Sequence, residues 1–140
     1  MLTEDASLGY ARIGELVHLS APAVHERVKR LRARGVIRRT AAALDPTAVG
    51  KPLLAFVHLD SEGWGPKQAL MAVAELPEVE EIHSVTGDSC LILKVRTAGP
   101  GALEEFLRRL YATPGVRATR SHVVLSTYLE RGVQAEGSLA

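Results

Sequence analysis

Seven basic side chains, with no acidic residue among them, occupy one short stretch near the start of the chain. Guanidinium and ammonium groups can pair with phosphates, and duplex DNA releases condensed counterions when such groups bind it. A solvated helix face usually mixes charges of both signs, so the absence of acids favours nucleic-acid contact over a face that only keeps the protein in solution. The seven residues are Arg27, Lys29, Arg30, Arg32, Arg34, Arg38 and Arg39.

A helix from Ala21 to Arg34 is predicted to carry most of these cations. Ser20 precedes it and is a good N-cap, because its hydroxyl can accept a hydrogen bond from an N–H group of the first turn. Pro22 lies in that turn, where a missing N–H costs little, and Gly35 ends the helix. The apolar stripe at helical spacing consists of Val24, Val28 and Leu31.

A shorter helix is predicted just before it, from Leu8 to Val17, with residues 18–20 as a tight connection. A helix, a short turn and a basic helix form the order of a helix-turn-helix. After Gly35 the chain is expected to continue as an extended segment, Val36 to Leu44. Turn residues then predict a linker at residues 45–51.

Charge is unevenly distributed along the chain. Residues 1–50 carry eight Lys/Arg against five acids, and the remainder carries nine against eleven. A basic first part and a mildly acidic second part suggest a binding module joined to another domain. The single cysteine, Cys90, excludes an intramolecular disulfide and favours a reducing compartment. No long apolar stretch or signal peptide is evident, so we expect a cytoplasmic protein that does not enter the membrane.

Beyond residue 51 the sequence repeats at a spacing of 37 residues. Pro77-Glu78-Val79 recurs as Pro114-Gly115-Val116, and Leu54–His58 matches Leu91–Val95. Helical patterns lie between these segments, and the second one runs from Leu103 to Tyr111. The first helical pattern consists of Ala69, Leu70, Val73 and Ala74. Two strand-helix-strand units in tandem predict an α+β protein with a ferredoxin-like βαββαβ domain, in which both helices cover one face of a four-stranded antiparallel sheet.

The other face of such a sheet would be left bare. We expect alternate strand positions such as Phe56, Leu91 and Leu93, or their neighbours according to register, to line it. An uncovered aliphatic face predicts self-association.

No constellation of residues predicts catalysis. The sequence shows no nucleophile with a matched base, no phosphate-cradling glycine loop and no recognisable pair of carboxylates. The histidines lack metal-ligand spacing, although His83 and His122 could meet across the sheet. Cys90 is expected to be a core residue, and Trp64 to pack at a subunit contact or to cap the first helix of the second domain. We therefore expect no enzyme, no metal site and no cofactor.

The order of helix-turn-helix, extended linker and ferredoxin-like domain resembles the Lrp/AsnC family of bacterial and archaeal transcription regulators. The resemblance covers about residues 2–128 and depends on the order and spacing of several motifs together. These motifs are Leu19-Ser20, Arg27–Leu31, Gly35–Ile37, Leu44–Pro46, Leu76–Val79, Thr86–Asp88 and Pro114–Val116.

The resemblance implies a sequence-specific, DNA-binding transcriptional regulator with a winged helix-turn-helix. It further implies a homodimer that assembles to an octamer and binds a small-molecule effector, usually an amino acid, at contacts between dimers. Effector binding would change the assembly and thereby DNA binding.

The expected organisation is a helix-turn-helix domain at residues 1–44, a linker at 45–51, an effector-binding and oligomerisation domain at 52–128, and a tail at 129–140. Only residues 2–6 correspond to the family's first helix. Without that cover, we expect partial exposure of Ile13, Leu16, Val24 and Leu31. The alternative function is therefore a stand-alone sensing or assembly module with impaired DNA binding.

Under this resemblance, the helix at 21–34 enters the major groove of double-stranded DNA. Side chains near its N-terminus would reach base edges, while flanking cations would hold phosphates. The set near the N-terminus is Ser20 at the N-cap, then Pro22, Ala23, His25, Glu26 and Arg27, the last as a bidentate partner of guanine. The phosphate set is Lys29, Arg30, Arg38 and Arg39.

The effector is expected to bind at the turn after the second strand. Gly87 would permit close approach of the backbone, and Asp88 can accept hydrogen bonds from an ammonium group. Thr86 and Ser89 would supply hydroxyls beside Val85. The alternative interpretation is an ordinary hairpin turn, for which Gly-Asp is common.

Overall fold

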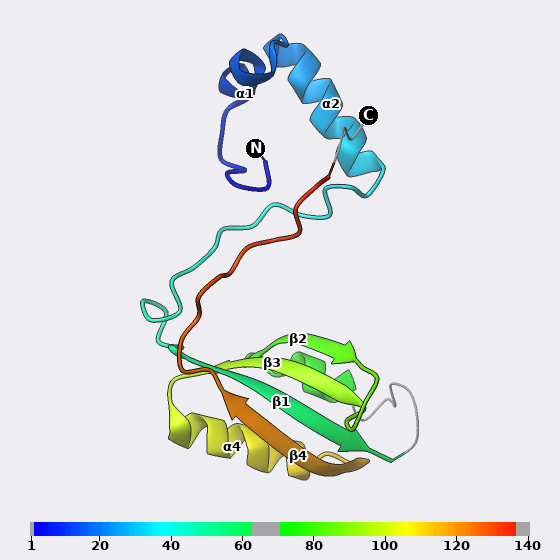
Figure 1. The fold of residues 1–140 in the computed structure, drawn as a ribbon, viewed down its shortest axis with the longest axis vertical. Helices are drawn as coiled ribbons and strands as arrows, with labels where there is room; N and C mark the ends of the chain where they lie inside the picture. Colours follow the sequence, from blue (N-terminus) through cyan, green and yellow to red (C-terminus); the bar gives the residue numbers. More distant parts are fainter. Residues whose placement is uncertain (1, 63–70, 137–140) are drawn as a thin grey trace. The chain divides into compact units, whose positions relative to one another are not determined.

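The computed structural model describes residues 2–62 and 71–136. They form two compact units, one made of residues 2–43 with 129–136 and the other lying within residues 44–128. Helices α1 and α2 belong to the first unit, and the sheet with its helices belongs to the second (Figure 1). Trp64 and the start of the first helical repeat pattern, Ala69 and Leu70, lie outside the described residues.

The helix-turn-helix is confirmed, with α1 at Tyr10–Val17 and α2 at Ala21–Ala33. Helix α1 begins two residues later than expected, and α2 ends one residue earlier. Ser20 is the N-cap of α2, and its side chain accepts a hydrogen bond of 3.3 Å from the N–H of Ala23. This cap satisfies one of the N–H groups that lack a partner at a helix start.

The turn between the two helices depends on a close backbone approach. His18 adopts a left-handed conformation (φ 57°), and its N–H donates to the carbonyl of Gly14. The N–H of Leu19 donates to the same carbonyl at 2.9 Å. A Cβ atom on Gly14 would lie only 2.3 Å from the carbonyl oxygen of Leu19. Glycine is therefore required at this position for the chain to turn so tightly.

Helix α2 ends in a Schellman motif, in which two N–H groups beyond the helix bond back to its last carbonyls. Gly35 has φ 72°, and its N–H donates to the carbonyl of Arg32 at 3.0 Å. The N–H of Val36 donates to the carbonyl of Leu31 at 2.9 Å. The helix end is thus fixed by backbone hydrogen bonds, and the direction of the following segment is set with it.

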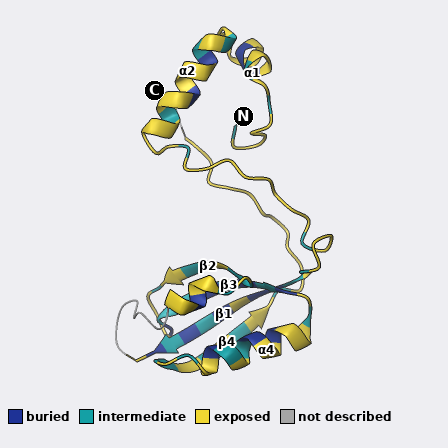
Figure 2. Cartoon of the chain, turned by 180° about the vertical axis from the view of Figure 1, so that it is seen from behind, coloured by how far each residue is buried: buried dark blue, intermediate teal, exposed yellow. Residues whose placement is uncertain are grey.

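The core of the first unit is small and aliphatic (Figure 2). Ile13 and Val24 are only 6% and 3% exposed, so the expectation that they would be partly uncovered is wrong. Leu31 is half-buried and Leu16 is 48% exposed, so the expectation of partial exposure is confirmed for these two residues. Residues that pack against the buried side chains Ile13, Val24 and Val28 are Leu2, Leu8, Tyr10 and Ile37.

An apolar groove of about 440 Å³ runs beside this core. Val17 and Leu19 lie in its wall and remain partly exposed. The chain from Leu129 onward groups with this unit, and Val133 and Ala135 line the groove. The described part of the tail contains no helix or strand.

The segment after α2 forms no wing strand in the described chain. Residues 38–45 belong to no strand and pair with none of the described strands. The expected extended segment is therefore present without the strand pairing that a winged helix-turn-helix would have.

The second unit is a four-stranded antiparallel sheet in the order β2-β3-β1-β4. A 3₁₀ helix and an α-helix connect the strands in the sequence, which confirms the βαββαβ arrangement and the α+β class. The strands are β1 at Leu53–Ser61, β2 at Val79–Ser84, β3 at Leu91–Thr97 and β4 at Val116–Val123; the helices are η1 at Ala72–Glu75 and α4 at Pro100–Tyr111.

Both helices cover the same face of the sheet. Val73 of η1 and Phe106 of α4 belong to one buried cluster with the central strands. Phe106 is fully buried in this cluster and is its largest side chain. The other members are Ala55, Val57, Leu59, Leu93, Val95, Leu103 and Leu110.

The uncovered face is not the aliphatic surface that the sequence predicted. Phe56 lies there, 37% exposed, but Leu93 is buried on the covered face and Leu91 packs against the same core. The register pairs Phe56 with Lys94 on one side and with His122 on the other. Since side chains alternate between faces, charged and imidazole groups occupy most of the uncovered face.

Ion pairs connect the strands on this uncovered face. Lys94 lies 3.3 Å from the carboxylate of Glu80, and Arg96 lies 2.7 Å from the same carboxylate. His83 hydrogen-bonds to Glu81 at 2.8 Å, and this hydrogen bond lowers the pKa of the Glu81 carboxyl.

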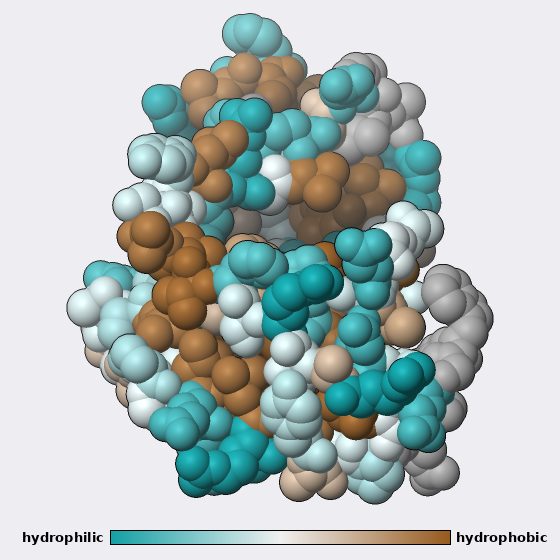
Figure 3. Space-filling view, turned by 60° about the horizontal axis from the view of Figure 1, so that its bottom comes forward, coloured by the Kyte–Doolittle hydropathy of each residue, from teal (hydrophilic) through white to brown (hydrophobic). Residues whose placement is uncertain are grey.

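The expected meeting of His83 and His122 is wrong, because β2 and β4 are the opposite edge strands of the sheet. His122 instead contacts His58 of β1, with ring centroids 5.0 Å apart. Cys90, expected in the core, is half-buried just before β3, and its N–H donates to the carbonyl of Leu59 at 3.2 Å. On the surface that Figure 3 displays, hydrophobic residues gather in broad groups with hydrophilic residues beside them.

Candidate nucleic-acid interface and effector loop

The exposed side of α2 carries the predicted DNA-contacting residues. Pro22, Glu26, Lys29 and Arg30 are all exposed. At about 100° per residue they point away from the buried stripe of Val24 and Val28. The helix therefore presents a polar, mainly basic surface on the side opposite its core.

His25, by contrast, lies on the flank of α2 that meets α1. Its ring is 5.4 Å from the ring of Tyr10, and its Nδ1 atom lies 3.8 Å from the carboxylate of Glu26. Ala23 is half-buried, and the hydroxyl of Ser20 serves the helix cap. Three of the predicted residues are thus tied to the geometry of the helix-turn-helix itself.

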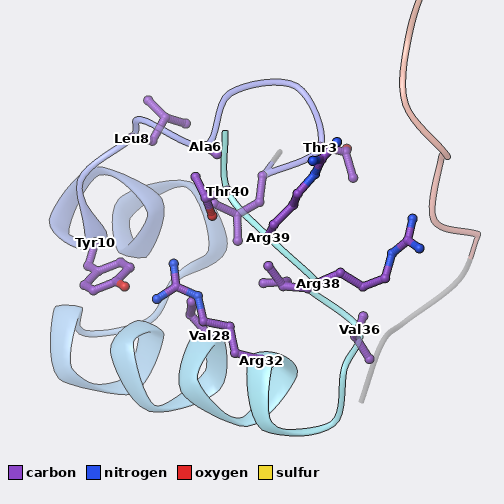
Figure 4. A pocket seen from close by; sticks show the side chains of 12 residues that line it. Thr3, Ala6, Leu8, Tyr10, Val28, Arg32, Val36, Arg38, Arg39 and Thr40 are labelled. Atoms are coloured by element: carbon purple, nitrogen blue, oxygen red, sulfur yellow. The ribbon is translucent and has the colours of Figure 1, made fainter. Parts of the chain in front are cut away.

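The remaining cations divide between the two flanks of α2. Arg27 lines the apolar groove on one flank. Arg38 and Arg39 line a separate pocket together with Arg32 and Tyr10 (Figure 4). Sequence reasoning placed Arg32 in the cation run but gave it no role. Its spacing of seven residues from His25 was the available signal that both lie on one flank.

The predicted effector turn is a six-residue loop between β2 and β3. The N–H of Val85 donates to the carbonyl of Cys90 at 3.0 Å, which closes the loop. Gly87 has φ 112°, a left-handed conformation that side-chain-bearing residues rarely adopt. Thr86 and Asp88 are exposed. The loop thus holds a carboxylate and a hydroxyl at the surface on either side of a glycine.

Ser89 is placed differently from its loop neighbours. It is 7% exposed, and its hydroxyl accepts a hydrogen bond of 3.2 Å from the guanidinium of Arg120 on β4. This contact anchors the loop to the far edge of the sheet. Sequence reasoning missed Arg120 because the two residues lie 31 positions apart and meet only through the strand order.

The described residues contain no group of three or more His, Cys, Asp and Glu side chains placed to hold a metal ion. Nor does any helix in the described part have the length and apolar character needed to cross a membrane.

Comparison with known proteins finds the same two parts in the same order. Residues 1–32 match the AsnC-type helix-turn-helix domain, and residues 54–134 match the Lrp/AsnC ligand binding domain. The HTH-type transcriptional regulator LrpA of Mycobacterium tuberculosis is 39% identical over 132 residues, which cover 91% of this chain and 87% of that protein.

Solved structures show the same similarity. An AsnC family transcriptional regulator from Agrobacterium tumefaciens has a TM-score of 0.88 and 28% identity, and the match covers 96% of this chain and 90% of that one. The feast or famine regulatory protein of M. tuberculosis, complexed with L-methionine, has a TM-score of 0.84 and 36% identity, with 92% and 88% covered.

A capped basic helix after a tight turn, joined to a ferredoxin-like sheet, therefore agrees with the domain matches and with relatives named as regulators, not enzymes. The chain belongs to the Lrp/AsnC family of helix-turn-helix, DNA-binding transcriptional regulators.

Proposed function

We propose that this regulator contacts double-stranded DNA through the exposed side of α2 and responds to an amino acid bound at the loop of residues 85–89. The observation that carries the first part is the exposed, mainly basic surface of α2, held in place by the Ser20 cap and the Gly35 motif. The second part rests on a relative of the same fold that is complexed with L-methionine.

We expect two kinds of contact with DNA, one to base edges and one to phosphates. Pro22, Ala23, His25 and Glu26 lie in the first turns of α2, which is where a recognition helix meets base edges. Arg27 would extend this set, with two N–H groups of its guanidinium donating to guanine.

Lys29 and Arg30 would hold phosphates through charge, without sequence preference, and so would Arg38 and Arg39 in the segment after the helix. All four are exposed, as such a role requires.

Three features of the loop support its role as an effector site. Asp88 is exposed and, within the described chain, has no ion-pair partner, so its carboxylate is available to an α-ammonium group. Gly87 lets a ligand approach the backbone. The hydrogen bond from Arg120 to Ser89 would link ligand binding at the loop to the edge strand of the sheet.

We infer that the uncovered sheet face associates with a second copy of the chain, and that dimers assemble further to an octamer. The face carries Phe56 and Ile92 between its charged rows, and the described helices lie on the other side. A second copy would bury these apolar groups and pair the remaining charges.

The DNA contacts can be tested by titrating the chain's own upstream DNA at several salt concentrations. Arg30→Ala should weaken binding to all sequences and reduce the slope of log K against log salt by about 0.9, the value for one lost phosphate contact. Arg117→Ala, an exposed cation on β4, is the matched control and should leave the slope unchanged. An unaltered slope for Arg30→Ala would reject its assignment.

Calorimetry with L-methionine and a panel of amino acids tests the effector site. Asp88→Asn should weaken binding of the responsive amino acid by about tenfold, because a charge-assisted hydrogen bond is lost. Glu75→Gln, an exposed acid on η1, should bind as the unmodified protein does. Equal binding by Asp88→Asn would place the ligand elsewhere.

A further inference from the structure

A pocket of about 610 Å³ lies within the DNA-binding unit, between the N-terminal segment, α2 and the residues that follow α2 (Figure 4). This volume is in the range of small-molecule sites. The pocket is separate from the loop at 85–89, which belongs to the other unit. Its apolar lining consists of Leu2, Ala6, Leu8, Val28, Val36 and Ile37.

The polar lining of this pocket is entirely neutral or positive. Arg32, Arg38 and Arg39 contribute three guanidinium groups, and no acidic residue lines the pocket. In Figure 4 the Arg32 side chain extends toward the side where Tyr10 lies, and Arg39 extends toward Thr3, while Arg38 points away. Two cationic groups, each with a hydroxyl on its side of the pocket, thus flank an apolar floor.

These arginines are available to a ligand. All three are exposed, and none forms an ion pair with another residue in the part of the chain that the structure describes. A guanidinium group offers a planar pair of N–H donors that matches a carboxylate. A ligand with a negative head group would therefore be held at the rim, and a cationic ligand would be repelled.

The aliphatic side chains that form the floor of the pocket determine which kind of anion fits. Val28 lines the pocket and is only 5% exposed, and half-buried aliphatic side chains such as Ile37 lie beside it. A DNA phosphate has no apolar group to place on such a floor, whereas an organic acid does. From the charge of the rim and the apolarity of the floor, we propose that this pocket binds an amphipathic organic carboxylate.

Such a ligand would act on DNA binding directly. It would neutralise the guanidinium, of Arg32 or of Arg39, that holds its carboxylate, so that phosphates and ligand would compete for the cations of this segment. This consequence rests on the phosphate role proposed above for Arg38 and Arg39, but binding of the carboxylate itself does not. By linkage, DNA should weaken carboxylate binding by the same factor.

Calorimetry on the full chain with decanoate, kept below its micellar concentration, tests the site. Saturable binding of decanoate is expected, with much weaker binding of acetate, which lacks the apolar body. Decylammonium has the same body with the opposite charge and should not bind. Equal binding of decanoate and decylammonium would overturn the proposal, since it would show apolar adsorption alone.

Variants locate the head group. Arg32→Gln and Arg39→Gln should each weaken decanoate binding, by about tenfold for whichever guanidinium holds the carboxylate. Arg30→Gln, on the outer side of the same helix and outside the pocket, is the matched control and should bind normally. Equal losses in Arg30→Gln and both pocket variants would mean nonspecific attraction to the basic surface and would overturn the site.

Methyl resonances give a readout that is independent of DNA. Decanoate should shift the signals of Val28 and Val36 and leave the amides of residues 85–89 unmoved. Shifts confined to the loop would place the ligand at the effector site and reject the pocket.

A DNA titration then tests the consequence. Decanoate should weaken DNA binding by the unmodified protein and by Arg30→Gln. It should not weaken DNA binding by the pocket variant that has lost decanoate binding.

Discussion

Gly14 is the residue on which the geometry of the helix-turn-helix depends most directly. Its carbonyl accepts hydrogen bonds from two successive N–H groups, and the space where a side chain would begin is filled by the backbone of Leu19. Backbone atoms cannot rotate away as a flexible side chain can, so the contact cannot be relieved locally.

Gly14→Ala should therefore destabilise the DNA-binding unit by about 1–3 kcal/mol, as overpacking does. Chemical denaturation followed by circular dichroism measures this. Gly9→Ala is the matched control, because no atom lies within 4 Å of a Cβ at that position. If both variants unfolded at the same denaturant concentration, the close approach at Gly14 would not be limiting.

Glu78 and Arg109 form an ion pair beside Lys51, whose Nζ donates to the carbonyl of Pro77 at 2.9 Å. Burial alone would raise the pKa of the Glu78 carboxyl, but the hydrogen bond and charge of Arg109, with the charge of Lys51, outweigh it and lower the pKa. A carboxyl with a lowered pKa in the folded state stabilises the protein above its unfolded pKa, about 4.3 for Glu.

That stabilisation should disappear as the pH falls through the pKa of folded Glu78. Glu78→Gln should be less stable than the unmodified protein near neutral pH, and the difference should shrink below about pH 4. Denaturation at a series of pH values measures both curves. Glu105→Gln, which alters an exposed pair with Arg108, should show little difference at any pH. A gap for Glu78→Gln that does not change with pH would contradict the electrostatic explanation.

At the scale of elements, the end of α2 determines where the second group of cations lies. The motif at Gly35 closes the helix and starts the segment that carries Arg38 and Arg39. The positive φ at Gly35 is available to glycine at little cost, while other residues pay a steric penalty.

Gly35→Ala should cost about 1 kcal/mol of stability and should also weaken DNA binding, because the last turn of α2 would fray. Thermal unfolding and the DNA titration measure the two effects. Gly101→Ala in α4, with no atom near its Cβ and no positive φ, should leave DNA binding unchanged and should not lower the stability. Unchanged DNA affinity in a destabilised Gly35→Ala would show that the cap does not position the arginines.

The elements themselves followed from the sequence to a large extent. Ser20, Pro22 and Gly35 marked the limits of α2 to within one residue, because caps act through local hydrogen bonds. The register of the sheet did not follow. Under the 37-residue repeat Phe56 corresponds to Leu93, yet the two lie on opposite faces. A shift of one residue reverses every side chain of a strand, and short apolar runs do not specify the shift.

The contacts of the candidate sites were predictable only where they are local. The exposed face of α2 came from helical periodicity. The Arg120–Ser89 hydrogen bond and the grouping of Arg32 with Arg39 required the tertiary fold, since neither pair is set by spacing alone.

For the molecule as a whole, the proposed self-association is expected to use the uncovered sheet face. Phe56 lies on that face of β1, beside Lys94 of β3 and His122 of β4. Phe56→Arg should reduce self-association, because a desolvated cation would replace an apolar contact. Light scattering measures the molar mass.

Ala102→Arg adds the same charge to the exposed side of α4 and is the matched control for Phe56→Arg. A monomeric unmodified protein at micromolar concentration would contradict the proposed dimer, and so would an unchanged assembly of Phe56→Arg.

The grouping of the chain after Tyr128 with the first unit has a consequence for how the protein can be divided. The helix-turn-helix unit is discontinuous in sequence, and the sheet unit is inserted into it. A single protease cut near Leu44 would break the only covalent link between α2 and the sheet unit, and the helices would then be held only by noncovalent contacts with the C-terminal segment. An isolated fragment of residues 1–43 would lack Val133 and Ala135 from its apolar groove, so domain-dissection experiments require both segments.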